Sequence, residues 1–262
     1  MTTNTDKIES PHYHHFHLNV TSPADTIKFY TSLLGAIEVK YRGVADALFT
    51  ERSFILFTKV ATPAPPTNTP ACILTHVGWA GVDGPHEYEW LKNQGVRFET
   101  PVTPIGEAHY MYFYGPDNEV LEIYTGEKNH RFNHIHHFCT DINAAVQWYV
   151  SNLGLKADGP IGPNARINRI RTDNINIIFH PKPPLKDGED FEITEGHVID
   201  HIAFSFRDIA SAYKRMERNG AKIVRPIKKD DLFGHNSFYV LGPEKVLIEI
   251  VEDKPIPEGI WE

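Results

Sequence analysis

Apolar and polar residues alternate in several short segments of the chain. The first of these, His15–Val20, has Phe16 and Leu18 at one set of alternate positions and His15 and His17 at the other. Side chains along a β-strand point alternately to the two faces of a sheet. The segment is therefore predicted to be a strand with one face in an apolar core and one face that carries histidines.

This alternating segment belongs to an internal repeat. The repeated pairs are 15–36 with 134–155, 76–98 with 201–223, and 115–124 with 242–251. The chain thus consists of four units in the order a, b, a′, b′, and each unit is predicted to fold as β-α-β-β-β.

Each predicted helix has a start and a stop signal. Ser, Thr and Asp cap helix N-termini, and glycine commonly follows the C-terminus. The candidate N-caps are Thr21 or Ser22, Asp83, Asp141 and Asp208, and the candidate stop residues are Gly35, Gly95, Gly154 and Gly220. Apolar runs at Ser53–Val60 and Asn174–His180 predict further strands.

The repeat predicts an α+β fold with two domains, residues 1–128 and 129–262. The four modules span about 13–60, 75–125, 133–180 and 197–252. The polar segment 125–132 is the predicted linker between the domains, and the proline-rich segments 62–70 and 181–188 are predicted loops.

Composition limits the classes of function. The formal net charge is -8 and no segment is strongly basic, which disfavours nucleic acid or an anionic membrane as a partner. No apolar run approaches the roughly 20 residues of a membrane span, and residues 1–11 lack the apolar region of a signal peptide. With two cysteines in unrelated contexts, a reduced, cytoplasmic protein is expected.

The 15 histidines include candidates for metal binding. In each half, two histidines that open strands and one strand glutamate occupy the polar side of an apolar sheet. The six candidates are His15, His76 and Glu122 in the first half, and His134, His201 and Glu249 in the second. Two imidazoles and a carboxylate with open coordination positions suit Fe(II) or Mn(II), with Zn(II) as a further possibility.

These motifs resemble those of the vicinal oxygen chelate superfamily over nearly all of residues 13–252. The opening histidine, the later "FY…LG" and the closing "GPDNEVLE" and "GPEKVLIE" carry the resemblance, although glycine replaces the usual aspartate before proline. The resemblance implies cupped, mostly antiparallel sheets, the six ligand positions above, a small-molecule substrate and a homodimer. Relatives with four modules pair either a with b and a′ with b′, or a with b′ and a′ with b, and both arrangements remain open.

The resemblance also suggests a reaction. Glyoxalase I-like members use a fourth ligand, near the positions of the apolar Leu56 and Ile178 here. The chain is therefore predicted to be an extradiol-type dioxygenase that acts on a small aromatic diol. The predicted metal site is His134, His201 and Glu249, with Tyr239, His180 and His235 as catalytic helpers. The alternatives are a metal-dependent isomerase, epimerase or lyase, and a non-catalytic binding protein of the resistance type.

Overall fold

The computed structural model describes residues 10–161 and 166–257; residues 1–9, part of the segment used to judge targeting, lie outside it. Unit a contains β1 (His12–Val20), α1 (Pro23–Leu34), β2 (Ile37–Tyr41), β3 (Ala45–Thr50) and β4 (Ser53–Lys59). Unit b contains β5 (Leu74–Gly81), α2 (Gly84–Asn93), β6 (Phe98–Ile105), β7 (Ala108–Tyr114) and β8 (Val120–Thr125). The first half of the chain therefore follows the predicted β-α-β-β-β order twice.

The second half repeats this order. Unit a′ contains β9 (Arg131–Cys139), α3 (Ile142–Leu153), β10 (Lys156–Ile161), β11 (Ile167–Arg171) and β12 (Asn176–Pro181). Unit b′ contains β13 (Ile199–Phe206), α4 (Ile209–Arg218), β14 (Lys222–Lys229), β15 (Asn236–Leu241), the short helix η2 (Pro243–Lys245) and β16 (Leu247–Glu252). The predicted linker is shorter than expected, because Arg131 and Phe132 already belong to β9.

The sixteen strands form two eight-stranded sheets. One sheet has the order β14-β15-β16-β13-β1-β4-β3-β2, and the other has the order β10-β11-β12-β9-β5-β8-β7-β6. The pairs β1–β4, β5–β8, β9–β12 and β13–β16 are parallel and the remaining pairs are antiparallel. The α+β fold with mostly antiparallel sheets is thus confirmed.

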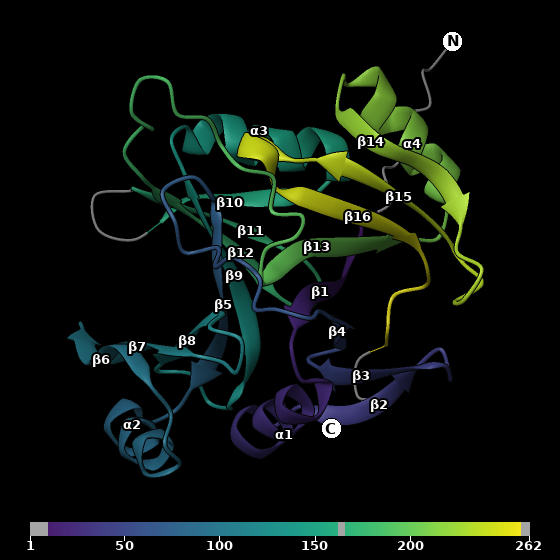
Figure 1. Cartoon of the computed structure of the whole chain (residues 1–262). Coiled ribbons are helices and arrows are strands. Elements are labelled where there is room, and N and C mark those ends of the chain that lie inside the picture. The colour runs from purple at the N-terminus through teal and green to yellow at the C-terminus, as the bar shows by residue number, and fades with distance from the viewer. Residues whose placement is uncertain (1–9, 162–165, 258–262) are drawn as a thin grey trace.

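The sheets combine units from different halves of the chain. Antiparallel pairing of β1 with β13 joins unit a to unit b′, and pairing of β5 with β9 joins unit b to unit a′. In Figure 1, α1 and α2 lie at one end and α3 and α4 at the other, while both sheets run between these ends. Of the two module pairings left open by the sequence, the structure has a with b′ and a′ with b. The division at residues 128 and 129 separates the sequence repeats, but it does not separate the sheets.

The local signals that position the strands occur where predicted. The side chains of Ser22, Asp83, Asp141 and Asp208 cap the four helices by accepting a backbone N–H bond. Gly35, Gly95, Gly154 and Gly220 have positive φ angles at or just after the helix ends, a conformation that glycine adopts without steric cost.

Aromatic residues fill the core where the two sheets meet. Phe132 of β9 contacts Tyr13 and Phe16 of β1, with ring centroids 6.0 and 5.5 Å away, and it contacts Trp79 of β5 at 5.1 Å. All four side chains are fully buried. This cluster joins the apolar faces of the central strands and leaves their histidine-bearing faces directed the opposite way.

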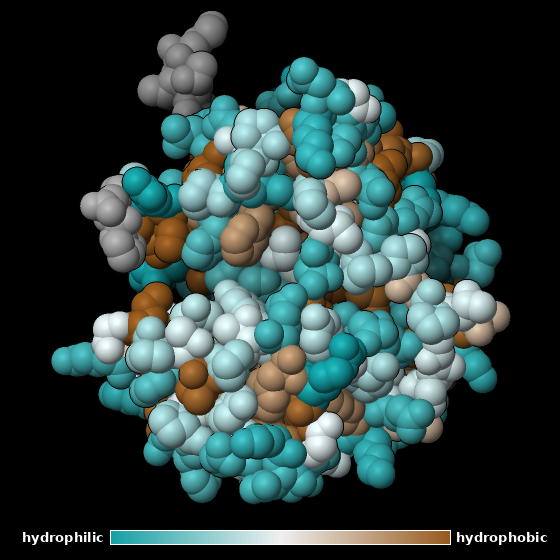
Figure 2. Space-filling model, turned by 60° about the vertical axis from the view of Figure 1, so that its left-hand side comes forward, coloured by the Kyte–Doolittle hydropathy of each residue, from teal (hydrophilic) through white to brown (hydrophobic). Residues whose placement is uncertain are grey.

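One face of the molecule is seen in a space-filling view. On the face shown in Figure 2, hydrophobic residues lie in separate patches among hydrophilic ones. No helix within the described ranges is both long and apolar enough to span a membrane.

Truncation of Phe132 should destabilise both sheets at their junction. We expect Phe132→Ala to lower the free energy of unfolding by about 3–5 kcal/mol, because it leaves a cavity among rings that cannot collapse. Urea unfolding followed by tryptophan fluorescence measures the change. Leu232→Ala is the control, since Leu232 is 60% exposed and its truncation should change stability by less than about 0.5 kcal/mol. A loss below about 1 kcal/mol for Phe132→Ala would show that the cluster does not hold the sheets together.

Candidate metal centres

One cluster of candidate ligands lies where β5, β8 and β9 are adjacent, and we call it the β5/β9 centre. It consists of His76, Glu122 and His134. Glu122 Oε2 lies 3.1 Å from His76 Nε2 and 2.9 Å from His134 Nε2. The three residues are 4%, 3% and 2% exposed, respectively. Ligands from two repeat units therefore converge in a buried position.

The equivalent cluster lies on β1, β13 and β16, and we call it the β1/β13 centre. It consists of His15, His201 and Glu249. Glu249 Oε2 lies 3.3 Å from His15 Nε2 and 3.5 Å from His201 Nε2, and the two ring nitrogens are 3.3 Å apart. Donor atoms about 2.1 Å from one shared ion are roughly 3.0–3.5 Å apart. The three donor atoms thus already have the spacing of metal ligands.

The residue before each ligand histidine orients its ring. The Nδ1 atoms of His76 and His134 bond to Thr75 Oγ1 at 2.9 Å and to Asn133 Oδ1 at 3.0 Å. In the β1/β13 centre, His201 Nδ1 bonds to Asp200 Oδ1 at 2.5 Å, and His15 Nδ1 bonds to His14 Nδ1 at 2.7 Å. Such bonds fix the tautomer and direct Nε2 to the metal. The sequence analysis did not predict these partners.

Gly78 makes room for the His134 ring. It pairs with His134 across β5 and β9, and a Cβ atom at this position would lie 2.0 Å from His134 Nε2. The equivalent pair in the β1/β13 centre is Ala203 with His15. The β5/β9 centre therefore depends on a glycine at a position where the other centre accommodates a methyl group.

Both centres favour a bound positive charge. Burial raises the pKa of the Glu122 and Glu249 carboxyl groups, but the neighbouring histidines outweigh it and hold each pKa well below its usual value. Burial lowers the pKa of His15. Burial also disfavours the charged form of His201, but its hydrogen bonds with Asp200 and Glu249 outweigh this effect and raise its pKa to about 9. An anionic carboxylate beside nitrogen donors fits a divalent metal, which can replace the proton held there.

A further histidine accompanies each centre. His136 Nε2 lies 3.5 Å from Glu122 Oε2, and His136 Nδ1 has no hydrogen-bond partner among the described residues. His17 stacks on His201 with ring centroids 4.8 Å apart and bonds to Thr58 Oγ1 at 2.9 Å. Each lies two residues after a candidate ligand. The repeated pattern His-x-His on an alternating strand was the signal that could have identified them.

The predicted catalytic helpers do not share one site. The ring of His180, on β12, is 4.7 Å from that of His136 in the β5/β9 centre. Tyr239 pairs with Glu249 and lies 5.5 Å from the His201 ring, in the β1/β13 centre. His235 packs against Phe233 and Tyr41, near the β1/β13 centre.

Two of the predicted groupings are therefore wrong. His180 cannot act together with Tyr239 and His235, and the expected metal set of His134, His201 and Glu249 is not assembled. The reason is the pairing of a with b′, which places unit a′ in the opposite sheet from unit b′.

The structure places a different tyrosine in the centre that His180 adjoins. Tyr112, on β7, pairs with Glu122, and its ring lies 4.9 Å from that of His76. The sequence analysis had identified Tyr239, ten residues before Glu249, as a helper; Tyr112 stands ten before Glu122. The β5/β9 centre thus combines the two histidines and one glutamate with both a tyrosine and His180.

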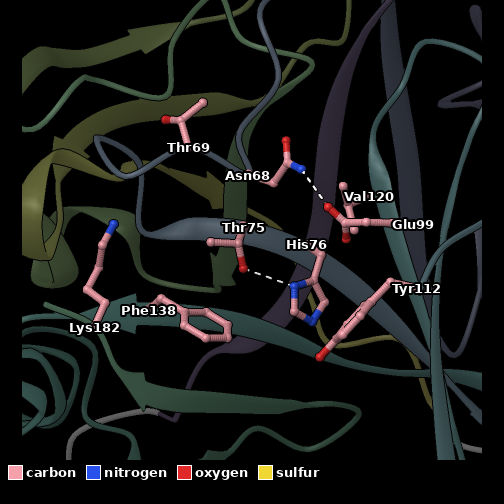
Figure 3. A pocket seen from close by; sticks show the side chains of 9 residues that line it. All are labelled: Asn68, Thr69, Thr75, His76, Glu99, Tyr112, Val120, Phe138 and Lys182. Carbon is pink, nitrogen blue, oxygen red and sulfur yellow. Dashed lines mark hydrogen bonds between the residues drawn. The ribbon is translucent and has the colours of Figure 1, made fainter. Parts of the chain in front are cut away.

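The two centres adjoin different pockets. A cavity of about 240 Å³ beside the β5/β9 centre is lined by His76, Tyr112, Val120 and Phe138, with Asn68, Thr69, Thr75, Glu99 and Lys182 at its edges. In Figure 3 the Tyr112 hydroxyl points toward the space between His76 and Phe138. The pocket beside Tyr239, of about 550 Å³, is larger and lined mainly by charged residues from Arg225 to Asp231.

Comparisons with known proteins agree with the fold and identify the family. The profile of the Glyoxalase/Bleomycin resistance protein/Dioxygenase superfamily matches residues 12–123 and 131–250. Glyoxalase I from Zea mays is similar in structure with a TM-score of 0.73 at 14% identity, over 93% of this chain and 92% of that one. A Bacillus subtilis protein described as a "putative dioxygenase" has a TM-score of 0.70 at 17% identity, over 95% and 87%. A search of curated proteins finds no match.

Filling the space at Gly78 should disable the β5/β9 centre alone. We expect Gly78→Ala to displace the His134 ring and to remove one metal ion per chain after reconstitution, measured by elemental analysis. Ala203→Gly, at the equivalent position of the other centre, is the control and should keep the wild-type metal content. Full metal content in folded Gly78→Ala would show that His134 is not a ligand.

Proposed function

Because the chain belongs to the Glyoxalase/Bleomycin resistance protein/Dioxygenase superfamily, we propose that it is a metal-dependent dioxygenase of the extradiol ring-cleaving type. Its substrate is a small aromatic diol, and the reaction takes place at the β5/β9 centre. The observation that carries the proposal is that Tyr112 contacts the His76 ring, while His180 stacks on His136, whose Nε2 lies 3.5 Å from Glu122 in the same centre. Family membership by itself fixes no reaction, since one fold hosts several chemistries.

His76, His134 and Glu122 would hold the metal, with Fe(II) as the first candidate and Mn(II) or Zn(II) as others. A bound divalent metal supplies Lewis acidity that stabilises an anionic substrate oxygen, together with open positions for the substrate. Glyoxalase I-like chemistry is less well supported, because Leu56 and Ile178, near the fourth ligand position, pair with His17 and His136 and offer no carboxylate.

Tyr112 is suited to orient the substrate. Its ring lines the cavity beside His76, and burial together with the Glu122 carboxylate raises its pKa far above the usual value. The phenol therefore keeps its proton and can donate a hydrogen bond to a substrate oxygen. Tyr112 is paired with Glu122 in the antiparallel register of β7 and β8, and this pairing keeps the phenol beside the candidate ligands.

His180 is suited to move a proton. Burial lowers its pKa to about 4, so that the ring is neutral near pH 7 and can accept a proton from a substrate hydroxyl. The ring is held by stacking on His136 at 4.7 Å and on Phe138 at 4.9 Å. In the β1/β13 centre the equivalent strand ends in Thr58 and Lys59, which provide no such base.

The apolar part of the cavity supports an aromatic substrate. Phe138 and Val120 offer apolar surface beside His76, against which an aromatic ring can pack. A volume of about 240 Å³ suits a small molecule.

A cytoplasmic location and a homodimer remain predictions.

Oxygen uptake tests the proposal. The protein is reconstituted anaerobically with Fe(II) and desalted, and oxygen consumption is followed with catechols and hydroquinones. We expect metal-dependent uptake, with kcat lowered about 10²–10⁴-fold in His180→Gln and to a smaller extent in Tyr112→Phe. Tyr239→Phe, in the other centre, is the matched control and should stay close to the wild type.

Two results would contradict the proposed function. The first is a protein that retains metal but turns over substrates of isomerase or lyase type without oxygen. The second is oxygen uptake that depends on Tyr239 and is unaffected by His180→Gln, which would move the reaction to the β1/β13 centre.

A further inference from the structure

A third cluster of metal-binding side chains lies outside both centres, where two connecting segments meet. Cys72 ends the segment between β4 and β5, while Glu192 and His197 belong to the segment between β12 and β13. We propose that Cys72, Glu192 and His197 bind a zinc ion that joins these two segments.

The donor atoms lie close enough together for one zinc ion to reach all three. Glu192 Oε2 lies 4.0 Å from Cys72 Sγ and 3.0 Å from His197 Nε2, and one donor atom from each residue lies within 4.8 Å of the others. Zinc binds sulfur at about 2.3 Å and nitrogen at about 2.0–2.1 Å, so tetrahedral ligands are roughly 3.3–3.6 Å apart. A bound zinc ion would draw Glu192 Oε2 and Cys72 Sγ closer together than their present 4.0 Å.

The cluster is held in place by the backbone around it. Glu192 N–H donates to the Ala71 carbonyl at 2.9 Å, and Val198 N–H donates to the Pro65 carbonyl at 2.8 Å. The Lys182 amine donates to the Cys72 carbonyl at 2.9 Å. Cys72 is fully buried and His197 nearly so, whereas Glu192 reaches the solvent. The two buried ligands are thus preorganised, and the exposed one leaves a path for a metal to enter.

The ligand types indicate which metal. A thiolate is a soft ligand that selects zinc over magnesium, calcium or manganese. The β5/β9 and β1/β13 centres contain no sulfur ligand, so the three sites differ in metal preference. Water would be the fourth ligand beside the three protein groups. Zinc itself has no redox chemistry, so the bound ion would not be oxidised or reduced.

A zinc ion here would act on the arrangement of the units. Cys72 comes two residues before β5, and His197 comes two residues before β13, in the other sheet. The ion would therefore tie the start of a central strand in one sheet to the start of its counterpart in the other, and should stabilise the a–b′ and a′–b pairing.

Cobalt substitution tests the site independently of catalysis. The full-length chain is freed of metal with a chelator, titrated with Co(II), and examined for the near-ultraviolet charge-transfer band that only thiolate coordination produces. We expect this band at one equivalent, its loss in Cys72→Ser, and its persistence in Cys139→Ser, which alters the other buried cysteine. Zinc should raise the Tm of the wild type and of Cys139→Ser by more than that of Cys72→Ser, in which only the β5/β9 and β1/β13 centres can still bind the ion.

The exposed ligand gives a second variant in case Cys72→Ser fails to fold. Glu192→Gln leaves the buried residues in place and should weaken zinc binding at least about tenfold, measured by competition with a chromophoric chelator. Absence of the charge-transfer band in the wild type, or its persistence in Cys72→Ser, would overturn the proposal. The proposed dioxygenase would be unaffected by either result.

Discussion

The antiparallel pairing of β1 with β13, and of β5 with β9, is the constraint on which the sites depend. Each pairing brings a histidine from one half of the chain opposite a strand from the other half, and parallel pairing with β16 or β8 then adds the glutamate. The apolar faces of the same strands pack around Phe132, so that folding the core also assembles the ligands. Neither half of the chain carries a complete centre.

The repeat produces two centres of similar construction but different surroundings. His134 lies over Gly78, whereas His15 lies over Ala203. The β5/β9 centre has His180 beside it and a small cavity with Phe138 and Val120, while the β1/β13 centre has Thr58 and a larger, charged pocket. The repeat thus supplies two sets of candidate metal ligands, and the residues around the two sets differ. We expect the β5/β9 centre, which has both Tyr112 and His180 beside it, to carry the reaction.

Local features could be predicted from the sequence because they depend on neighbouring residues. Helix caps such as Asp141, and the alternation that puts Phe16 and His15 on opposite faces, follow from backbone geometry and appear as predicted. The grouping of distant units does not follow from such rules, because a and b carry equivalent ligands to a′ and b′. The sequence analysis therefore grouped His180 with Tyr239, whereas the fold puts His180 in the centre that contains Tyr112. His136, two residues after His134, was overlooked although the strand period places both on one face.

Metal content of double variants tests this cross-half arrangement most directly, in a Cys72→Ser background that removes the proposed zinc site. Each single variant, His15→Ala, His201→Ala or His76→Ala, should lose one metal ion per chain. If β1 and β13 share a centre, His15→Ala combined with His201→Ala still loses one ion, while His15→Ala combined with His76→Ala loses two. The reverse outcome would contradict the account: two ions lost from His15→Ala with His201→Ala, and one ion lost from His15→Ala with His76→Ala. That result would place the ligands of each centre within a single half of the chain.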